Sequence, residues 1–237
     1  MIDAVYFAVS ESSKNKILTL SKRFKIKVRV LRIVKQVELP FDIEKYLKKH
    51  FDWIVFTSSF GAKTFSKKVM KKGVFHYLID TKFAAVGSET AKTLKENGLG
   101  VHFMPKHYTT AALAEEIVIS KGEKVLTVRS KEGDDLLEKK LSERSCYVTR
   151  LNAYKEIVRR RTISLKKDDV VVFGSSYILQ SFTKLLKNVK PEDLFAIAIG
   201  PKTLSKAKEL GYRIKGNVKT YTYEGVFESL RDTLNGL

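Results

Sequence analysis

The sequence predicts an α/β protein of two Rossmann-like or flavodoxin-like domains with parallel sheets, joined by a two-stranded β-ladder. Three observations support this fold class. Short apolar runs alternate with segments of helical spacing along the 237 residues, which is the pattern of parallel strands joined by right-handed crossovers. The same order of runs occurs twice. The apolar runs give way to turns that carry Ser, Thr or Gly, as is typical of strand-to-helix turns.

The first half contains short strands separated by helices. Strands are expected where residues are apolar or alternate in polarity, and helices where apolar residues recur every three or four positions, as do Ile17, Leu18 and Leu20. The expected strands are 4–9, 25–37, 53–56, 84–86 and 101–103, and the expected helices are 14–24, 59–72, 90–97 and 110–120.

The second half repeats this order. Pro201 stands in the first turn of a helix, where its missing N–H carries no penalty. Gly98 and Gly211 follow the helices that begin after Gly87 and Gly200, at the point where a helix end favours a left-handed residue. The expected strands are 124–128, 146–154, 170–173, 196–199 and 212–214, with a helix at 134–142.

The repeat is visible residue by residue. Phe-Thr-Ser-Ser at 56–59 is echoed by Phe-Gly-Ser-Ser at 173–176. A wider spacing near the N-terminus pairs Val34 with Tyr154. The chain is therefore expected to contain two copies of one α/β unit, each near the usual domain size. A further matching stretch is 85–98 against 198–211.

Two extended stretches fall at equivalent points of the repeat, 33–39 and 152–158. Neither contains Gly or Pro before Pro40, so they are expected to pair as a short ribbon between domains. The second domain is then inserted in the first. The expected domains are 1–34 plus 160–237 and the inserted 36–155, with the crossover strands at about 33–39 and 152–158.

The formal net charge of +19 indicates an anionic partner. Nucleic acid, anionic lipid and a polycarboxylate or polyphosphate small molecule all meet this condition. The lysines are scattered over expected helix faces, and the one compact basic run is 159–161. No zinc-finger spacing, aromatic ribonucleoprotein motif or basic zipper is present, so nucleic acid is the less favoured partner.

Several classes of protein and site are not supported. No apolar run approaches the roughly 20 residues that span a bilayer, and the run at 4–9 is too short for a signal-peptide core, so we expect a cytoplasmic protein without membrane contact. The single Cys146 excludes an internal disulfide, and the four histidines show no helical pair spacing. We expect no metal and no cofactor, because dinucleotide, phosphate-loop and nucleophile-elbow motifs are also absent.

Hydroxyl- or glycine-bearing turns form the candidate binding site. The first N–H groups of a helix lack internal partners and attract anions, and Ser or Thr adds one more donor. Simple N-capping uses the same residue types and is the alternative at each turn. The candidate residues are Thr57, Ser58, Ser59, Gly87, Thr90 and Thr109 in the first half, and Ser175, Ser176, Gly200, Thr203 and Thr222 in the second.

Two candidate residues have no counterpart of the same kind in the other half. Arg129 follows an apolar strand and could bind a carboxylate in bidentate fashion, or pair with the nearby Glu132 or Asp134. Tyr154 ends an alternating strand at the domain crossover. A core tyrosine is the ordinary interpretation; alternatively its phenol, with a normal pKa near 10, donates a proton in a cleft between the domains.

Taken in order, these motifs resemble those of the uroporphyrinogen-III synthase family over essentially the whole chain. The motifs are FTSSFGAKTF, the pair AVGSETAKTLKENG and AIGPKTLSKAKELG, the pair YTTAALAEEI and YTYEGVFESL, VLTVRS, and LNAYKE. The resemblance implies two α/β domains joined by a two-stranded ladder, with the site in the cleft between them. It also implies a cofactor-free cyclisation of the linear tetrapyrrole hydroxymethylbilane, with inversion of the terminal ring through a spiro intermediate and loss of water.

The resemblance also implies roles for individual residues. Tyr154 matches a tyrosine proposed to assist departure of the hydroxyl as water, and Thr203 matches a threonine of the substrate cleft. Thr90, Ser58 and Ser176 lie at equivalent turns. A departure is Gly174-Ser175, where many members have Ser-Pro. We expect a monomer that binds a polycarboxylate tetrapyrrole; a non-catalytic two-domain protein for a sugar phosphate or nucleotide, and a basic nucleic-acid-binding protein, remain the alternatives.

Overall fold

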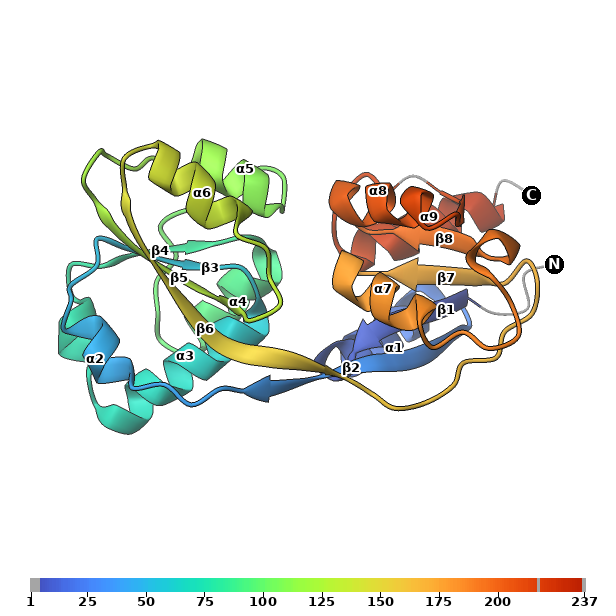
Figure 1. Ribbon diagram of the computed structural model, residues 1–237, viewed down its shortest axis with the longest axis horizontal. Helices are drawn as coiled ribbons and strands as arrows, with labels where there is room; N and C mark the ends of the chain where they lie inside the picture. Colours follow the sequence, from blue (N-terminus) through green and yellow to red (C-terminus); the bar gives the residue numbers. More distant parts are fainter. Residues whose placement is uncertain (1–4, 217, 236–237) are drawn as a thin grey trace. The chain divides into compact units, whose positions relative to one another are not determined.

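The computed structural model describes residues 5–216 and 218–235. The chain divides into two compact units (Figure 1): unit 1 comprises Met1–Gln36 and Ile157–Leu237, and unit 2 comprises Val37–Glu156. Ala4, the first residue of the first expected strand, lies outside the described residues. Each unit is an α/β layered structure with a parallel sheet, which confirms the predicted fold class.

Unit 2 has the strand order β4-β3-β5-β6, and all three pairings are parallel. Helices lie on both faces of this sheet, with α5 and α6 on one side and α2, α3 and α4 on the other (Figure 1). The strands are β3 (Trp53–Phe56), β4 (Lys82–Ala85), β5 (Lys124–Ser130) and β6 (Tyr147–Val158). The helices are α2 (Ile43–Leu47), α3 (Ser59–Lys72), the 3-10 helix η2 (Phe75–Leu78), α4 (Ser88–Glu96), α5 (Thr110–Glu116) and α6 (Leu136–Glu143).

Unit 1 has the strand order β2-β1-β7-β8-β9, also in parallel pairings. Residues of α1 and α9 pack on one face, and residues of α7 and α8 pack on the other. The strands are β1 (Val5–Ser10), β2 (Val28–Glu38), β7 (Val170–Phe173), β8 (Phe195–Ala198) and β9 (Arg213–Ile214). The helices are η1 (Glu11–Ser13), α1 (Lys14–Phe24), α7 (Ser176–Thr183), η3 (Pro191–Asp193), α8 (Pro201–Glu209) and α9 (Tyr223–Asn235).

The central strands are buried on both faces because helices cover both. All four residues of β3 and of β7 are buried. Alternate side chains of each strand therefore enter different cores: Phe56 packs with Phe65 of α3, whereas Val55 packs with Leu137 of α6. Continuous apolar runs without polar alternation are typical of such doubly covered parallel strands.

The two strands that pass from one unit to the other, β2 and β6, are neighbours in the strand order. The N–H of Leu39 donates to the carbonyl of Ala153 at 2.9 Å, and the N–H of Arg159 donates to the carbonyl of Ile33 at 2.9 Å. The partners run in opposite directions along the two strands, so the pairing is antiparallel. The predicted two-stranded ribbon is therefore confirmed.

A shift of register occurs at the same point of both units. In unit 2 Arg129 faces Asn152, but the next residue, Ser130, faces Tyr154. In unit 1 Val9 faces Arg32, and Ser10 faces Val34. One residue of the partner strand is skipped in each case, which is a β-bulge. The structure thus pairs the two halves as the wider sequence spacing predicted, with Val34 equivalent to Tyr154.

Several predicted boundaries are confirmed residue for residue, among them Lys14–Phe24, Trp53–Phe56 and Ser59–Lys72. Pro201 lies in the first turn of α8, and Gly98 and Gly211 have φ of 77° and 85°.

Two expectations are wrong. The strand expected at 101–103 is reduced to one bridge between Ala84 and Phe103. The helix expected to reach residue 120 ends at Glu116, because Ile117 is extended, with ψ of 128°. The β-branched run 117–119 favours this extended conformation.

Candidate functional site

Most of the candidate residues lie at the carboxyl edges of the two sheets. In a parallel sheet every strand ends at the same edge, so the turns that follow β3, β4 and β5 of unit 2 gather there. The turns that follow β7 and β8 of unit 1 do the same. The structure therefore brings the candidate residues together within each unit.

The turns after β3 and β7 are capped alike. The Ser58 hydroxyl accepts a hydrogen bond from the N–H of Gly61 at 3.1 Å, and the Ser175 hydroxyl accepts one from Ile178 at 3.2 Å. Both residues have an extended backbone, as N-caps do. Thr57 is half-buried and Ser59 is exposed. The Ser176 hydroxyl oxygen is buried and has no hydrogen-bond partner among the described residues.

The turns after β4 and β8 contain two buried threonines at equivalent positions. Thr90 and Thr203 are the third residues of α4 and α8, with exposed fractions of 4% and 5%. Within the described part of the chain, neither hydroxyl makes a hydrogen bond. Gly87 and Gly200 cap these helices without a side chain. Each turn therefore holds an unused hydroxyl beside bare backbone N–H groups.

The turns before α5 and α9 are capped by threonines. The Thr109 hydroxyl accepts a hydrogen bond from Ala112 at 3.0 Å, and the Thr222 hydroxyl accepts one from Gly225 at 3.0 Å. The alternative interpretation, N-capping, therefore holds at Ser58, Thr109, Ser175 and Thr222. A cap uses an oxygen lone pair, however, and leaves the hydroxyl proton able to donate to a ligand.

Tyr154 is a buried residue of unit 2, with an exposed fraction of 4%. Its hydroxyl donates to the Ser58 hydroxyl oxygen at 2.9 Å, and its ring lies edge-on to Phe60 with the centroids 5.0 Å apart. Burial raises the pKa of Tyr154 to about 12, against a smaller opposite effect of the hydrogen bond to Ser58. The expected pKa near 10 is therefore too low, and the phenol is protonated at neutral pH.

The bulge in β6 decides where Tyr154 points. Successive side chains of a strand point to opposite faces. Ala153 lies on the face that α3 covers, so Tyr154 would point to the α6 face in a regular strand. Because the register skips Ala153, both side chains enter the α3 core. Bulges re-aim side chains in this way near functional sites.

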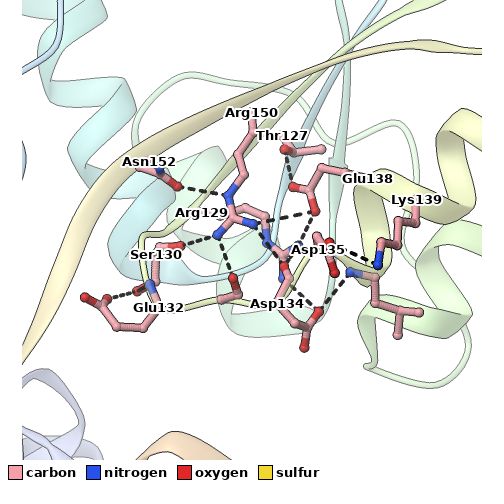
Figure 2. A network of polar contacts seen from close by, with 12 residues as sticks. Thr127, Arg129, Ser130, Glu132, Asp134, Asp135, Glu138, Lys139, Arg150 and Asn152 are labelled. Carbon is pink, nitrogen blue, oxygen red and sulfur yellow. Dashed lines mark hydrogen bonds and ion pairs between the residues drawn. The ribbon is translucent and has the colours of Figure 1, made fainter.

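Arg129 lies in a polar network beneath α6 (Figure 2). One terminal nitrogen, Nη1, donates to the Glu138 carboxylate at 2.7 Å and to the Asp134 carbonyl at 2.8 Å. The other oxygen of Glu138 accepts from the Thr127 hydroxyl at 2.6 Å. The Arg129 Nε atom is buried and has no hydrogen-bond partner in the described part of the chain. The guanidinium is thus mainly occupied by protein groups.

Arg150 holds the loop between β5 and α6, residues 131–135, by its backbone (Figure 2). Its Nη2 donates to the carbonyls of Ser130 at 2.9 Å and Gly133 at 2.7 Å, and its Nη1 donates to the carbonyl of Asp134 at 3.1 Å. Its Nε donates to the Asn152 side chain at 2.9 Å. One arginine therefore fixes the path of the whole loop.

The same loop is tied to the strand that carries Tyr154. The N–H of Lys131 donates to the Tyr154 carbonyl at 2.9 Å. The Glu132 carboxylate accepts from the Ser130 hydroxyl at 2.6 Å and from the N–H of Glu156 at 2.9 Å. The network of Arg129 and Arg150 is thereby connected to the backbone of Tyr154.

The expected pairing of Arg129 with Asp134 is found, through the Asp134 carbonyl at 2.8 Å and its carboxylate at 3.9 Å, but the shorter ion pair is with Glu138 at 2.7 Å. Sequence reasoning missed Glu138 and Arg150. The sequence could have indicated Arg150, because it lies two residues before Asn152 and two residues apart on a strand share a face. Glu138 lies nine residues beyond Arg129, in a separate element, and no sequence pattern indicated that the two would pair.

A further hydroxyl-rich turn, between β1 and α1, was also missed. The Ser10 hydroxyl lies 3.0 Å from that of Ser12 and 3.1 Å from that of Ser13. Glu11 pairs with Arg32 and Arg159. The Arg159 hydrogen bond lowers the pKa of Glu11. The spacing that pairs Val34 with Tyr154 also pairs Ser10 with Ser130, and could have indicated this turn.

Within 5–216 and 218–235, no three His, Cys, Asp or Glu side chains are grouped so as to hold a metal ion. In the same residues, no helix has both the length and the apolar character needed to cross a membrane.

Comparison with known proteins gives consistent matches. The family model described as uroporphyrinogen-III synthase HemD matches residues 26–228. The porphyrin biosynthesis protein HemD of Ruminiclostridium josui is 30% identical over 175 residues, which is 70% of this chain, and the chain spans 35% of that relative's length.

Two solved structures share the fold. A mutant uroporphyrinogen III synthase from the extremely thermophilic bacterium Thermus thermophilus has a TM-score of 0.65 and 17% identity, with 100% of both chains covered. The uroporphyrinogen-III synthetase from Helicobacter pylori has a TM-score of 0.66 and 19% identity, covering 99% of this chain and 100% of the other. At these identities the likeness is one of fold.

Proposed function

The chain belongs to the uroporphyrinogen-III synthase family, and from this premise we propose that it converts hydroxymethylbilane to uroporphyrinogen III in tetrapyrrole biosynthesis. In this reaction the linear tetrapyrrole is closed into a ring, its terminal pyrrole is inverted through a spiro intermediate, and water is lost. Family membership is the observation that carries the proposal. The chemistry of the turns supports it.

The substrate is a flexible polycarboxylate, and both units offer donors suited to carboxylates. Each has helix N-termini at its sheet edge, where unpaired N–H groups attract anions. Each also has one largely buried threonine, Thr90 in unit 2 and Thr203 in unit 1, whose hydroxyl oxygen is not among the fully buried unpaired atoms of the described residues. The net charge of +19 favours the same ligand. We assign these turns to the acetate and propionate arms.

The catalytic demand on the protein is mainly positional. Holding the two ends of the substrate together raises their effective concentration. Loss of the hydroxyl gives a reactive azafulvene-like cation, so the enzyme must control which ring position attacks it. The proton for the departing hydroxyl is assigned to the hydrogen-bonded hydroxyls of Tyr154 and Ser58, and a pKa of about 12 keeps the phenol protonated at neutral pH.

Arg129 stays a candidate for substrate binding, but we also assign it a structural role. Its pairing with Glu138 favours a role in holding the loop that contacts Tyr154. We further propose a monomer in the cytoplasm that acts without nucleic acid, membrane or cofactor.

The direct test supplies hydroxymethylbilane made enzymatically and separates the type III product from the type I product. The type III isomer is expected. If only the type I isomer forms, as in the spontaneous closure, the proposed function is wrong, and a binding protein for an anionic small ligand becomes the better interpretation. Binding that needs the lysine and arginine surface and falls steeply with salt would instead indicate nucleic acid.

A further inference from the structure

The phenol of Tyr154 does not offer its proton to a ligand directly. A phenol has one hydrogen, and that of Tyr154 is donated to the Ser58 hydroxyl oxygen at 2.9 Å. The ring is buried against Phe60, and the backbone of Gly61 lies beside it, where an added Cβ would be 3.5 Å from a ring carbon. A ligand therefore meets Ser58 before it meets Tyr154.

The Ser58 hydroxyl is left with only its proton to offer. A hydroxyl accepts two hydrogen bonds and donates one. Its two acceptor positions are used by the Tyr154 hydroxyl and by the N–H of Gly61. Its own proton has no acceptor among the described residues. Ser58 is also half-buried, unlike Tyr154, so the proton can reach a bound molecule.

Both members of the pair are held by backbone. Ser58 is the N-cap of α3, a helix of 14 residues, and its position follows from the first turn of that helix. Tyr154 is turned toward α3 by the bulge in β6, and its carbonyl is held by the N–H of Lys131. The backbone positions of the two residues are thus set by the helix cap and by the sheet.

We infer that Ser58 is the catalytic residue that contacts the departing hydroxyl of the substrate, and that Tyr154 is a positioning residue that acts through Ser58. The inference rests on the proposed function. A donated hydrogen bond polarises the next hydroxyl in a chain, so Tyr154 makes the Ser58 proton a better donor than that of an isolated serine.

The bond between the hydroxymethyl carbon and its oxygen breaks, and the electron pair leaves with the oxygen. That oxygen takes the Ser58 proton and departs as water, while the Tyr154 proton moves to Ser58. The pyrrole N–H proton of the resulting cation passes to the Ser58 oxygen while the Ser58 proton returns to Tyr154, which restores both hydroxyls. The protein ends unchanged, and the substrate has lost one water.

Unit 1 contains the same cap without the relay. Ser175 caps α7 as Ser58 caps α3. The residue equivalent to Tyr154 is Val34, which is fully buried and has no hydroxyl. The hydroxyl pair is therefore a property of one half, as the chemistry of a single leaving group requires.

The test compares kcat and KM of Ser58→Ala, Tyr154→Phe, their double variant and Ser58→Thr. Ser58→Ala is expected to lower kcat about 100-fold, with a smaller change in KM, and to release more type I product. Tyr154→Phe is expected to lower kcat less, because Ser58 keeps its proton. The double variant should be no slower than Ser58→Ala, since the two residues act in series. Ser58→Thr keeps the hydroxyl and should restore most of kcat.

A matched control separates the relay from helix capping. Asp42 caps α2 in the same unit, where its carboxylate accepts from Glu44 and Lys45. Asp42→Ala is expected to lower Tm by roughly 2–4 °C, as the loss of a cap does, with kcat unchanged. Ser58→Ala also leaves the buried Tyr154 hydroxyl without its acceptor, so it should lower Tm by at least as much, and it should lower kcat as well.

Two results would overturn the inference while wild type still makes the type III isomer: Ser58→Ala with kcat within about twofold of wild type, or a double variant whose loss is the product of the single losses. Wild type that makes only the type I isomer would instead remove the proposed function itself.

Discussion

The guanidinium of Arg129 and the carboxylate of Glu138 meet at 2.7 Å with side chains that are 5% and 14% exposed. Removing two charges from water is costly, and the mutual attraction repays that cost only when the geometry is good and the remaining polar atoms are bonded. Thr127 and the Asp134 carbonyl supply such bonds. The pair is therefore a point at which one substitution leaves an uncompensated buried charge.

We expect Glu138→Leu to lower the free energy of unfolding by about 3–5 kcal/mol, because it leaves Arg129 buried without its partner. The double variant Arg129→Met, Glu138→Leu should be clearly more stable than Glu138→Leu alone. Urea unfolding followed by circular dichroism measures both. Arg129→Met alone completes the cycle: if the double variant loses the sum of the losses of Arg129→Met and Glu138→Leu, the pair is not coupled and this expectation is wrong.

Two tyrosines are expected to destabilise the fold at high pH. Burial raises the pKa of Tyr154 and of Tyr212 to about 12, above the value near 10 of an unfolded chain. Below pH 10 the phenols are protonated in the folded and in the unfolded state, so their full contribution to the free energy of unfolding is present. Between about pH 10 and 12 the unfolded chain ionises first, so stability is lost as pH rises.

The measurement is an ultraviolet titration of tyrosinate together with unfolding at several pH values. Tyr154→Phe should remove part of the absorbance change that occurs near pH 12, and should reduce the fall in stability between pH 10 and 12. A Tyr154→Phe protein whose titration curve matches wild type in that range would contradict the assigned burial.

Gly225 is expected to be indispensable at the start of α9. A Cβ at this position would overlap the carbonyl oxygen of Thr220, which is backbone and cannot turn away. The gain in helix propensity from Gly225→Ala is about 1 kcal/mol, whereas forcing such an overlap costs roughly 1–3 kcal/mol or more. We expect net destabilisation, with Thr222 displaced, since Gly225 donates to it.

Gly200→Ala is the control for Gly225→Ala. Gly200 has φ of −131° and no atom within 4 Å of an added Cβ. The Gly200→Ala variant should lose less than about 1 kcal/mol of the free energy of unfolding. Thermal unfolding compares the two variants, and equal losses would mean that the overlap at Thr220 is relieved by movement of the turn.

The inserted unit, residues 37–156, is expected to fold when expressed alone. It has cores on both faces of its own sheet, and its ends are close, because Leu39 donates to Ala153. Neighbouring ends at the surface of a unit favour excision of a domain. We expect a cooperative urea transition with retained helical circular dichroism. A broad transition with strong binding of a hydrophobic dye would show that this unit depends on the remainder of the chain.

Local sequence patterns were sufficient for most of the fold. The run Trp53–Phe56 and the capped helix Ser59–Lys72 are found as predicted, because strand burial and helix capping are determined by neighbouring residues. The segment expected as a strand at 101–103 does lie beside β4, with the N–H of Ala85 donating to the Phe103 carbonyl, but it forms one bridge and no full strand.

The site was less predictable than the fold. The hydroxyl turns follow from composition and position, so Ser58, Thr90 and their counterparts could be named. The contact of Tyr154 with Ser58 joins residues 96 positions apart, and it depends on a bulge that skips Ala153. Nothing in the local sequence specifies that bulge. The partnership of Arg129 with Glu138 likewise arises from how α6 packs on β5.

The repeated bulge has a consequence for how this chain acquired its asymmetry. Duplication of an ancestral half copies backbone geometry as well as side chains, and here the orientation of positions 34 and 154 is common to both copies. What differs is one side chain, valine in one and tyrosine in the other. The side chain at this pre-oriented position can therefore give the two units different chemistry without any change of backbone.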